Sequence, residues 1–146
     1  MLPTAHIACA LVINRLAGLD RGLVPAVLGS LVPDAIDKTL AWVLDAVPAS
    51  RHIGHTPFAA GLATIGASTV FGRRKGLALG AAYLAHLVAD LWHGGHVPWL
   101  MPFRRYRERG RRWHVRLSGN ELALELAGAV VILLMLRAAT QRTTGE

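Results

Sequence analysis

The chain has 146 residues, of which 53% are hydrophobic and 17% are charged, and its net charge is +7. Soluble domains usually carry about a quarter charged residues, so this composition favours a protein of the membrane over a soluble helical bundle rich in Ala and Leu. The single cysteine, Cys9, excludes an intramolecular disulfide and a cysteine-based metal site.

The first third of the chain contains short apolar or amphipathic segments. Residues 5–16 and residues 23–31 predict two helices, each shorter than the roughly 20 residues that a membrane crossing needs. The second helix is expected to end at Pro33, because proline disrupts a helix interior. Residues 34–48 follow as an amphipathic stretch.

The rest of the chain contains longer apolar segments. Residues 53–72 carry no formal charge over 20 residues, which is enough for one membrane crossing. Residues 76–92 predict the next helix, and the apolar run 126–136 belongs to the last one. We therefore predict an all-α integral membrane helical bundle with about four membrane-associated helices. It forms a single domain over residues 1–139, and residues 140–146 are expected to be a disordered tail.

The cations are concentrated in two clusters, residues 73–75 and the seven arginines between Arg104 and Arg116. Such clusters beside apolar segments usually bind anionic headgroups and set the topology. A single crossing by residues 76–92 would put the two clusters on opposite sides, against the positive-inside rule. Either residues 76–103 enter the membrane and return on the same side, or one cluster binds phosphate. Nucleic-acid binding is disfavoured, because no recognisable nucleic-acid module surrounds the arginines.

Ionisable side chains recur in or beside the apolar segments, where they are costly and therefore point to function. Imidazole and carboxylate groups are also the common ligands of zinc and similar ions. The residues concerned are His6, Asp34, Asp37, His52, His55, His86, Asp90, His93 and His96.

The spacing within residues 76–96 strengthens this interpretation. His86, Asp90 and His93 stand at i, i+4 and i+7 and share one helix face. A buried carboxylate without a partner costs several kcal/mol, and a metal ion would remove that cost. The alternative is a hydrogen-bonded His–Asp pair that joins two helices.

Asp34 and Asp37 have a simpler alternative explanation. At the start of a helix, Asp34 would be an N-cap and Asp37 a first-turn anion. His52 and His55 open the charge-free segment, where an isolated histidine is usually an interfacial polar group.

The order of these residues resembles the inner-membrane metal-dependent hydrolase family that includes the bacterial YdjM, LexA-regulated proteins. The resemblance runs from about residue 5 to residue 125, and its motifs are His6, Val-Pro-Asp34 with Asp37, Arg51-x3-His55-Thr56, Ala-His86-x3-Asp90, Val97-Pro98 and Pro102. That family is similar in turn to the zinc-dependent phospholipase C and single-strand nuclease superfamily. Glu121-x3-Glu125 stands where the superfamily has His-x3-Glu.

The residues and the resemblance together imply a multi-pass inner-membrane hydrolase that binds one or two zinc ions, with manganese as an alternative. The expected ligands are His6, Asp34, His55, His86 and Asp90, followed by His52, His96 and Glu121. The metal would lower the pKa of a bound water and polarise a phosphoryl oxygen. Asp34 or Asp37 would act as a general base, and Arg104, Arg105 and Arg107 would bind the substrate phosphate.

A site at bilayer depth favours a phosphoester lipid as substrate, in a protein whose other partner is the membrane lipid itself. One rival is a metal-binding protein or ion transporter, which would use the same side chains without hydrolysis. A second rival is a structural membrane protein whose polar residues only join its helices.

Overall fold

The computed structural model describes residues 3–19, 23–47, 51–92, 97–103 and 119–143, and this part of the chain is helical without strands. The elements are α1 (Pro3–Leu16), α2 (Leu23–Lys38), the π-helical turn η1 (Thr39–Val43), α3 (Pro57–Phe71), α4 (Arg73–Trp92) and α5 (Gly119–Thr143). The predicted all-α class is confirmed over these residues. The last helix continues to Thr143, so the first residues of the predicted tail are helical.

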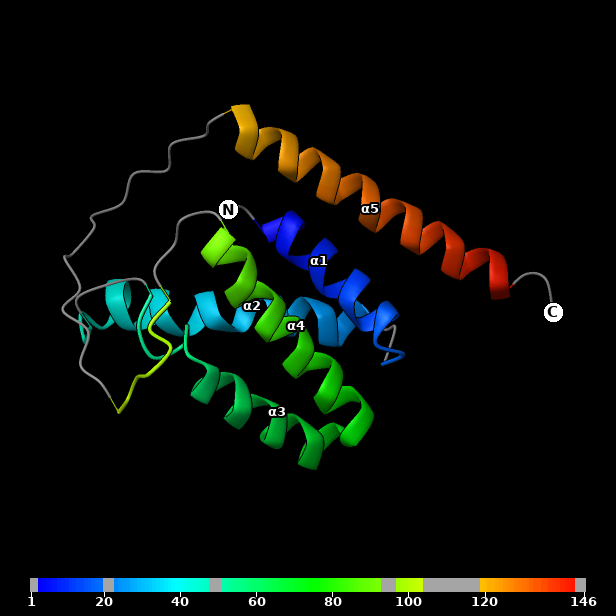
Figure 1. Cartoon of the computed structure of the whole chain (residues 1–146). Helices are drawn as coiled ribbons and strands as arrows, with labels where there is room; N and C mark the ends of the chain where they lie inside the picture. The colour runs from blue at the N-terminus through cyan, green and yellow to red at the C-terminus, as the bar shows by residue number, and fades with distance from the viewer. Residues whose placement is uncertain (1–2, 20–22, 48–50, 93–96, 104–118, 144–146) are drawn as a thin grey trace.

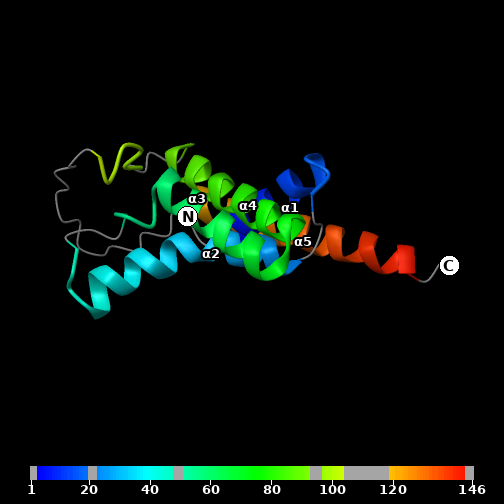
Figure 2. The same ribbon diagram turned by 90° about the horizontal axis from the view of Figure 1, so that it is seen from below.

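Helix α4 is the centre of the bundle. It packs against α1, α2 and α3, whereas α5 packs against α1. Figure 1 shows α3 and α4 as an antiparallel pair and α2 crossing α4, with α5 alongside α1. The C-terminal end of α5 extends past the other helices, as the view from below shows (Figure 2). Three helices thus surround the helix that carries His86 and Asp90.

Helix α2 passes through Pro33 without ending, and the predicted end at that residue is wrong. A proline inside a helix removes one backbone hydrogen bond, but Pro33 is buried in the bundle and α2 is held along its length by α4. Tertiary packing therefore outweighs the local preference. Asp34 and Asp37 consequently lie in the last turns of α2, which excludes the N-cap interpretation for both.

Helix α3 is shorter than the charge-free segment that contains it. It begins at Pro57, and the Thr56 side chain caps it by accepting a hydrogen bond from Ala59 N at 3.0 Å. Its 15 residues span about 22 Å, less than the roughly 30 Å of a bilayer core. In the described part of the chain, no helix combines the length and the apolar character that a membrane crossing requires.

Small residues let the helices approach closely. A Cβ on Gly29 of α2 would lie 2.6 Å from Ala82 Cβ of α4, and one on Gly128 of α5 would lie 2.8 Å from the Ala5 backbone of α1. Both contacts are too short for any larger side chain. Glu125 of α5 reinforces the second contact, because it accepts hydrogen bonds from the backbone N–H and hydroxyl of Thr4 at the start of α1.

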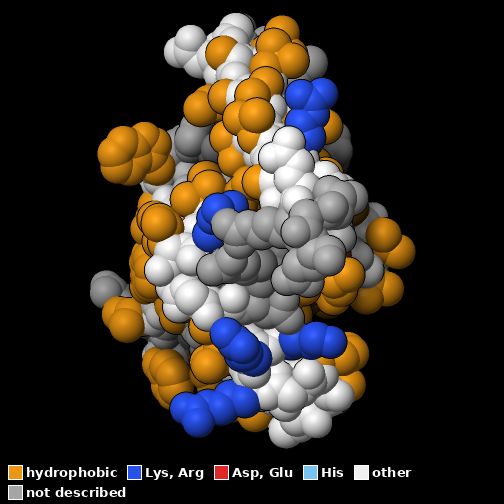
Figure 3. Space-filling view, turned by 90° about the vertical axis from the view of Figure 1, so that its right-hand side faces the viewer, with side chains coloured by type: hydrophobic (Ala, Val, Ile, Leu, Met, Phe, Trp, Pro, Cys, Tyr) orange, Lys and Arg blue, Asp and Glu red, His pale blue; other side chains and the backbone are white. Residues whose placement is uncertain are grey.

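Large apolar side chains are exposed on every described helix. Figure 3 shows them covering much of one face, with lysine and arginine side chains between them. Examples from the outer sides of α3 and α5 are Leu62, Ile65, Val70, Leu126 and Leu133. A surface of this kind suits contact with apolar material better than contact with water alone.

Candidate metal centre

Ligand-type side chains from four separate segments converge between α1, α2 and α4. They form two groups of three that share His86, and within each group the candidate ligand atoms lie within 4.8 Å of one another. We call His6, His86 and Asp90 the first triplet, and Asp34, His55 and His86 the second triplet. The structure thus brings together the five residues expected to be the principal ligands.

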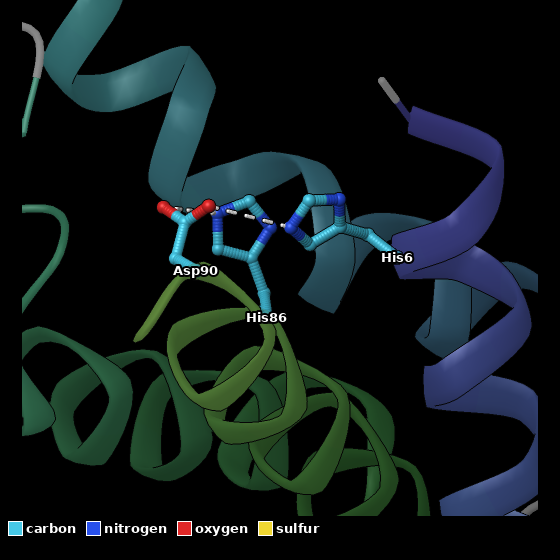
Figure 4. Close-up of side chains that lie close together, drawn as sticks. All are labelled: His6, His86 and Asp90. Atoms are coloured by element: carbon cyan, nitrogen blue, oxygen red, sulfur yellow. Dashed lines mark ion pairs between the residues drawn. The ribbon is translucent and has the colours of Figure 1, made fainter. Parts of the chain in front are cut away.

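The first triplet joins α1 to α4 and is fully buried. His6 Nε2 lies 3.6 Å from Asp90 Oδ1, and the rings of His6 and His86 have their centroids 4.2 Å apart. Figure 4 shows His6 pointing from α1 toward His86 and Asp90, which project from one face of α4. The i, i+4 spacing of the last two residues produces this common direction.

The second triplet joins α2, the segment before α3, and α4. His55 Nε2 lies 3.4 Å from Asp34 Oδ1 and 3.3 Å from His86 Nε2. The same nitrogen is 3.4 Å from Asp90 Oδ2. Asp90, a member of the first triplet, therefore also contacts the second triplet. One of its oxygens lies toward His6 and the other toward His55.

These separations fit a metal ion. Ligand atoms at 2.0–2.1 Å from a tetrahedral zinc ion lie about 3.3–3.4 Å from one another. The distances from Asp90 to His6, His55 and His86, and from His55 to Asp34 and His86, are 3.3 to 3.9 Å, and the other pairs within a triplet lie within 4.8 Å. Each triplet supplies three protein ligands from the described residues. Three ligands and one open position are the arrangement of catalytic zinc sites, whereas structural sites are closed by four.

Asp37 is in neither triplet and has a different role. It is fully buried and accepts four hydrogen bonds, from the backbone N–H groups of His52, Gly54 and His55 and from His55 Nδ1. The last of these, at 2.7 Å, fixes the His55 ring so that Nε2 faces Asp34 and Asp90. Asp37 is thus a positioning residue that orients a candidate ligand from behind.

Two residues that the sequence analysis did not single out complete the anchoring of residues 51–56. Tyr83 donates its hydroxyl hydrogen to the Gly54 carbonyl at 2.5 Å. A Cβ on Gly54 would lie 2.8 Å from the Pro33 carbonyl oxygen, so only glycine fits this approach. Tyr83 lies three residues before His86 on α4, and that spacing is the only sequence signal that could have revealed it.

The pKa values of two neighbouring imidazoles, His55 and His86, are shifted in opposite directions. Burial alone would lower the pKa of His55, but the carboxylates of Asp34, Asp37 and Asp90 outweigh it and raise this pKa to about 10. Burial and the adjacent His6 lower the pKa of His86 to about 4. At neutral pH His86 is therefore the neutral ring, ready to bind a cation, and His55 must lose a proton first.

The remaining predicted site residues lie elsewhere. His52 and Glu121 are described and belong to neither triplet. His52 contributes its backbone N–H to Asp37, and Glu121 lies in the first turn of α5. The other predicted residues are outside the described part of the chain, namely His96 among the ligands, and Arg104, Arg105 and Arg107 for phosphate.

Comparison with known proteins adds one match. A family model described as "YdjM inner membrane protein" matches residues 1–144, nearly the whole chain. Neither a curated protein nor a solved structure matches significantly.

Proposed function

The chain belongs to the YdjM inner membrane protein family, and we propose that it is a metal-dependent hydrolase that cleaves a phosphoester. The observation that carries this proposal is the pair of triplets around His86, each of which offers three candidate ligands among the described residues. One or two ions fit this arrangement. Zinc suits the mixture of imidazole and carboxylate ligands best, and manganese is the alternative.

A bound divalent ion would supply a water of lowered pKa and would polarise a phosphoryl oxygen. The chain itself offers two further functions. His6, His55 and His86 would present ring nitrogens to the ion, and His55 would lose its proton first. Asp34 is the more accessible carboxylate for a general base, because its side chain is 29% exposed, and in that role it would act instead of serving as a ligand of the second triplet.

Asp37 is unsuited to the general-base role. Both of its oxygens accept hydrogen bonds and its side chain has no exposed surface. A base must reach the proton that it removes. We therefore assign the catalytic role to Asp34 and keep Asp37 as the residue that orients His55.

The substrate class follows from location. An inner-membrane family and many exposed apolar side chains favour a phosphoester whose other part is a lipid. Several membrane crossings, and a role of Arg104, Arg105 and Arg107 in binding the phosphate, stay predictions. So does the distant relation to the zinc-dependent phospholipase C superfamily.

Metal binding or ion transport without hydrolysis is the second candidate function, because the same buried carboxylates and imidazoles could carry a cation. A site that only holds an ion is usually closed by four ligands of its own, whereas the described residues supply three to each triplet.

Metal analysis of the detergent-purified protein tests the proposal. Wild type should hold one or two zinc ions, His86→Ala should hold none because both triplets lose a ligand, and Asp90→Ala should lose at least one. His52→Ala is the matched control, a nearby histidine outside both triplets, and it should keep the wild-type zinc content.

A screen of lipid phosphates with the zinc-loaded protein then separates hydrolysis from storage or transport. Release of phosphate by wild type and the His52→Ala variant, but not by Asp34→Asn, is the expected result. A wild type that stays metal-free after zinc and manganese supplementation would refute the proposed function.

A further inference from the structure

Arg51 pairs with Asp90 from the outer side of the site. Its Nε donates to Asp90 Oδ2 at 2.6 Å and its Nη2 donates to Oδ1 at 2.9 Å. The arginine side chain is 37% exposed, whereas the aspartate side chain is 3% exposed. The guanidinium group is therefore half-exposed beside a buried candidate metal ligand, and we call this edge of the site its mouth.

The position of Arg51 is fixed by the residues that follow it. The backbone N–H of His52 is held by Asp37 at 2.5 Å, and the carbonyl of Gly54 is held by Tyr83. Since the chain is anchored directly after Arg51, its side chain starts from a defined point. The two hydrogen bonds to Asp90 use two of the five N–H groups of a guanidinium, so three remain for an acceptor on the exposed side.

A second cation has the same relation to the other triplet. Lys38 pairs with Asp34, and its side chain is 40% exposed. Each triplet thus has one carboxylate that is covered by a half-exposed cation. The charged side chains at the centre are three carboxylates and two cations, namely Asp34, Asp37, Asp90, Lys38 and Arg51. With neutral histidines these side chains sum to a single negative charge, so one divalent ion makes the centre net positive.

A centre that is net positive with an ion bound favours a further anion beside these cations. A guanidinium group and a divalent ion that share one carboxylate repel each other, and the repulsion is strong in a partly buried site. A phosphate group removes it, because its oxygens face both cations. Arginine is also the side chain whose planar N–H groups match two phosphate oxygens at once.

We propose that Arg51 binds the phosphate group of the substrate at the mouth of the site, through the N–H groups that do not hold Asp90. This inference rests on the proposed function, because the anion is drawn to a centre that holds a metal ion. It assigns phosphate recognition to a residue that the structure describes. The group recognised belongs either to a lipid headgroup or to free phosphate.

The test uses the detergent-purified, zinc-loaded full chain as wild type, Arg51→Gln and Arg51→Lys. Arg74→Gln is the matched control, since Arg74 is an exposed arginine at the start of α4 that contacts the Gly18 carbonyl instead of the triplets. Zinc content is measured first, independently of any activity. Binding of inorganic phosphate is then measured by calorimetry, and binding to detergent micelles doped with phosphatidic acid or phosphatidylcholine is measured in parallel.

The Arg51→Gln variant should keep the zinc content of wild type and bind phosphate about 10- to 100-fold more weakly, as expected for the loss of hydrogen bonds from a charged donor. Arg51→Lys should keep part of the affinity, and Arg74→Gln should keep all of it. Weaker binding of Arg51→Gln to phosphatidic acid micelles identifies a lipid phosphate as the ligand. An effect confined to inorganic phosphate identifies free phosphate.

Three results would overturn the inference. The first is equal binding of phosphate by wild type and Arg51→Gln. The second is a wild type that holds zinc but binds neither form of phosphate. The third is loss of zinc from both Arg51 variants, which would make Arg51 a structural partner of Asp90. A wild type without zinc would instead refute the proposed function, and the zinc measurement distinguishes that failure from the other three.

Discussion

Asp34 and Asp37 are three residues apart on one helix, yet the structure predicts different effects of replacing them with asparagine. Asp37→Asn should mainly lower stability, and Asp34→Asn should mainly lower zinc binding. Asp37 accepts three hydrogen bonds on Oδ2 and one on Oδ1, all without exposure to solvent. In Asp37→Asn one oxygen becomes an NH2 group. The asparagine loses the fewest hydrogen bonds when its oxygen takes the place of Oδ2 and its NH2 group takes the place of Oδ1. The NH2 group then faces the Gly54 N–H, which donates to Oδ1 at 2.7 Å in wild type, so two donors oppose each other.

The magnitude follows from these contacts. Loss of one hydrogen bond to a charged acceptor costs about 1.5–3 kcal/mol, and the three that remain weaken because their acceptor is no longer charged. Asp37→Asn should therefore lower the free energy of unfolding by about 3–5 kcal/mol. For a domain of this size the expected fall in Tm is about 10 °C.

Asp34→Asn is the matched comparison. Asp34 pairs with the half-exposed Lys38, and exposed ion pairs contribute about 0–1 kcal/mol. Because Asp34 also faces His55 Nε2 at 3.4 Å and helps to raise the pKa of that ring, its replacement should lower the Tm of the metal-free protein, but by less than Asp37→Asn does. It should also remove zinc from the second triplet.

The assay is thermal unfolding in detergent after chelation, together with zinc analysis of the untreated protein. An Asp37→Asn variant that unfolds at the wild-type temperature would contradict the positioning role. Equal destabilisation by the two variants would show that the two carboxylates do not differ in the way that we describe.

Three further predictions concern stability. The chelated protein should be most stable near pH 6.5. Because the pKa of His55 is raised, its contribution to the free energy of unfolding is present below pH 6.5 and is lost as the pH rises toward 10. Because the pKa of His86 is lowered, the free energy of unfolding falls as the pH falls from 6.5 toward 4. Denaturant titrations across this range measure the free energy of unfolding, and a flat profile would contradict both shifts. Gly128→Ala should lower the unfolding free energy by about 1–3 kcal/mol, because its Cβ meets the backbone of α1, whereas Gly61→Ala, with no atom within 4 Å, should be neutral or raise it by about 0.5–1 kcal/mol. Thr56→Ala should cost about 1 kcal/mol through loss of the α3 cap, and a Tm equal to that of wild type would argue against the cap.

The helices were largely predictable because their signals are local. Apolar runs and the glycine and proline residues between them predicted α1 and α4 close to their observed ends, whereas α5 continues to Thr143, into the predicted tail. Pro33 misled the prediction for α2, since its local cost is outweighed by packing against α4. The charge-free segment 53–72 misled the prediction for α3, because Asp37 and Tyr83 hold its first residues in a non-helical conformation.

The candidate site was predictable by residue type but not by arrangement. Histidine and aspartate in apolar segments stood out individually because burial of such groups is costly. His86 and Asp90 could also be placed on one helix face from their spacing. The pairing of Arg51 with Asp90 could not be foreseen, because it joins residues 39 positions apart.

Local patterns in the sequence are enough to predict the helical class and the residue types available for a metal, since helical period and the cost of buried polar groups are properties of short segments. The packing of the helices is needed to show that His86 is shared between two triplets, and that Asp34 belongs to one of them while Asp37 accepts hydrogen bonds from residues 52–55. Those assignments depend on which neighbour each side of α2 and α4 meets. Two residues one turn apart on a helix point within about 60° of each other, so spacing alone cannot separate a ligand from the residue that holds it in place.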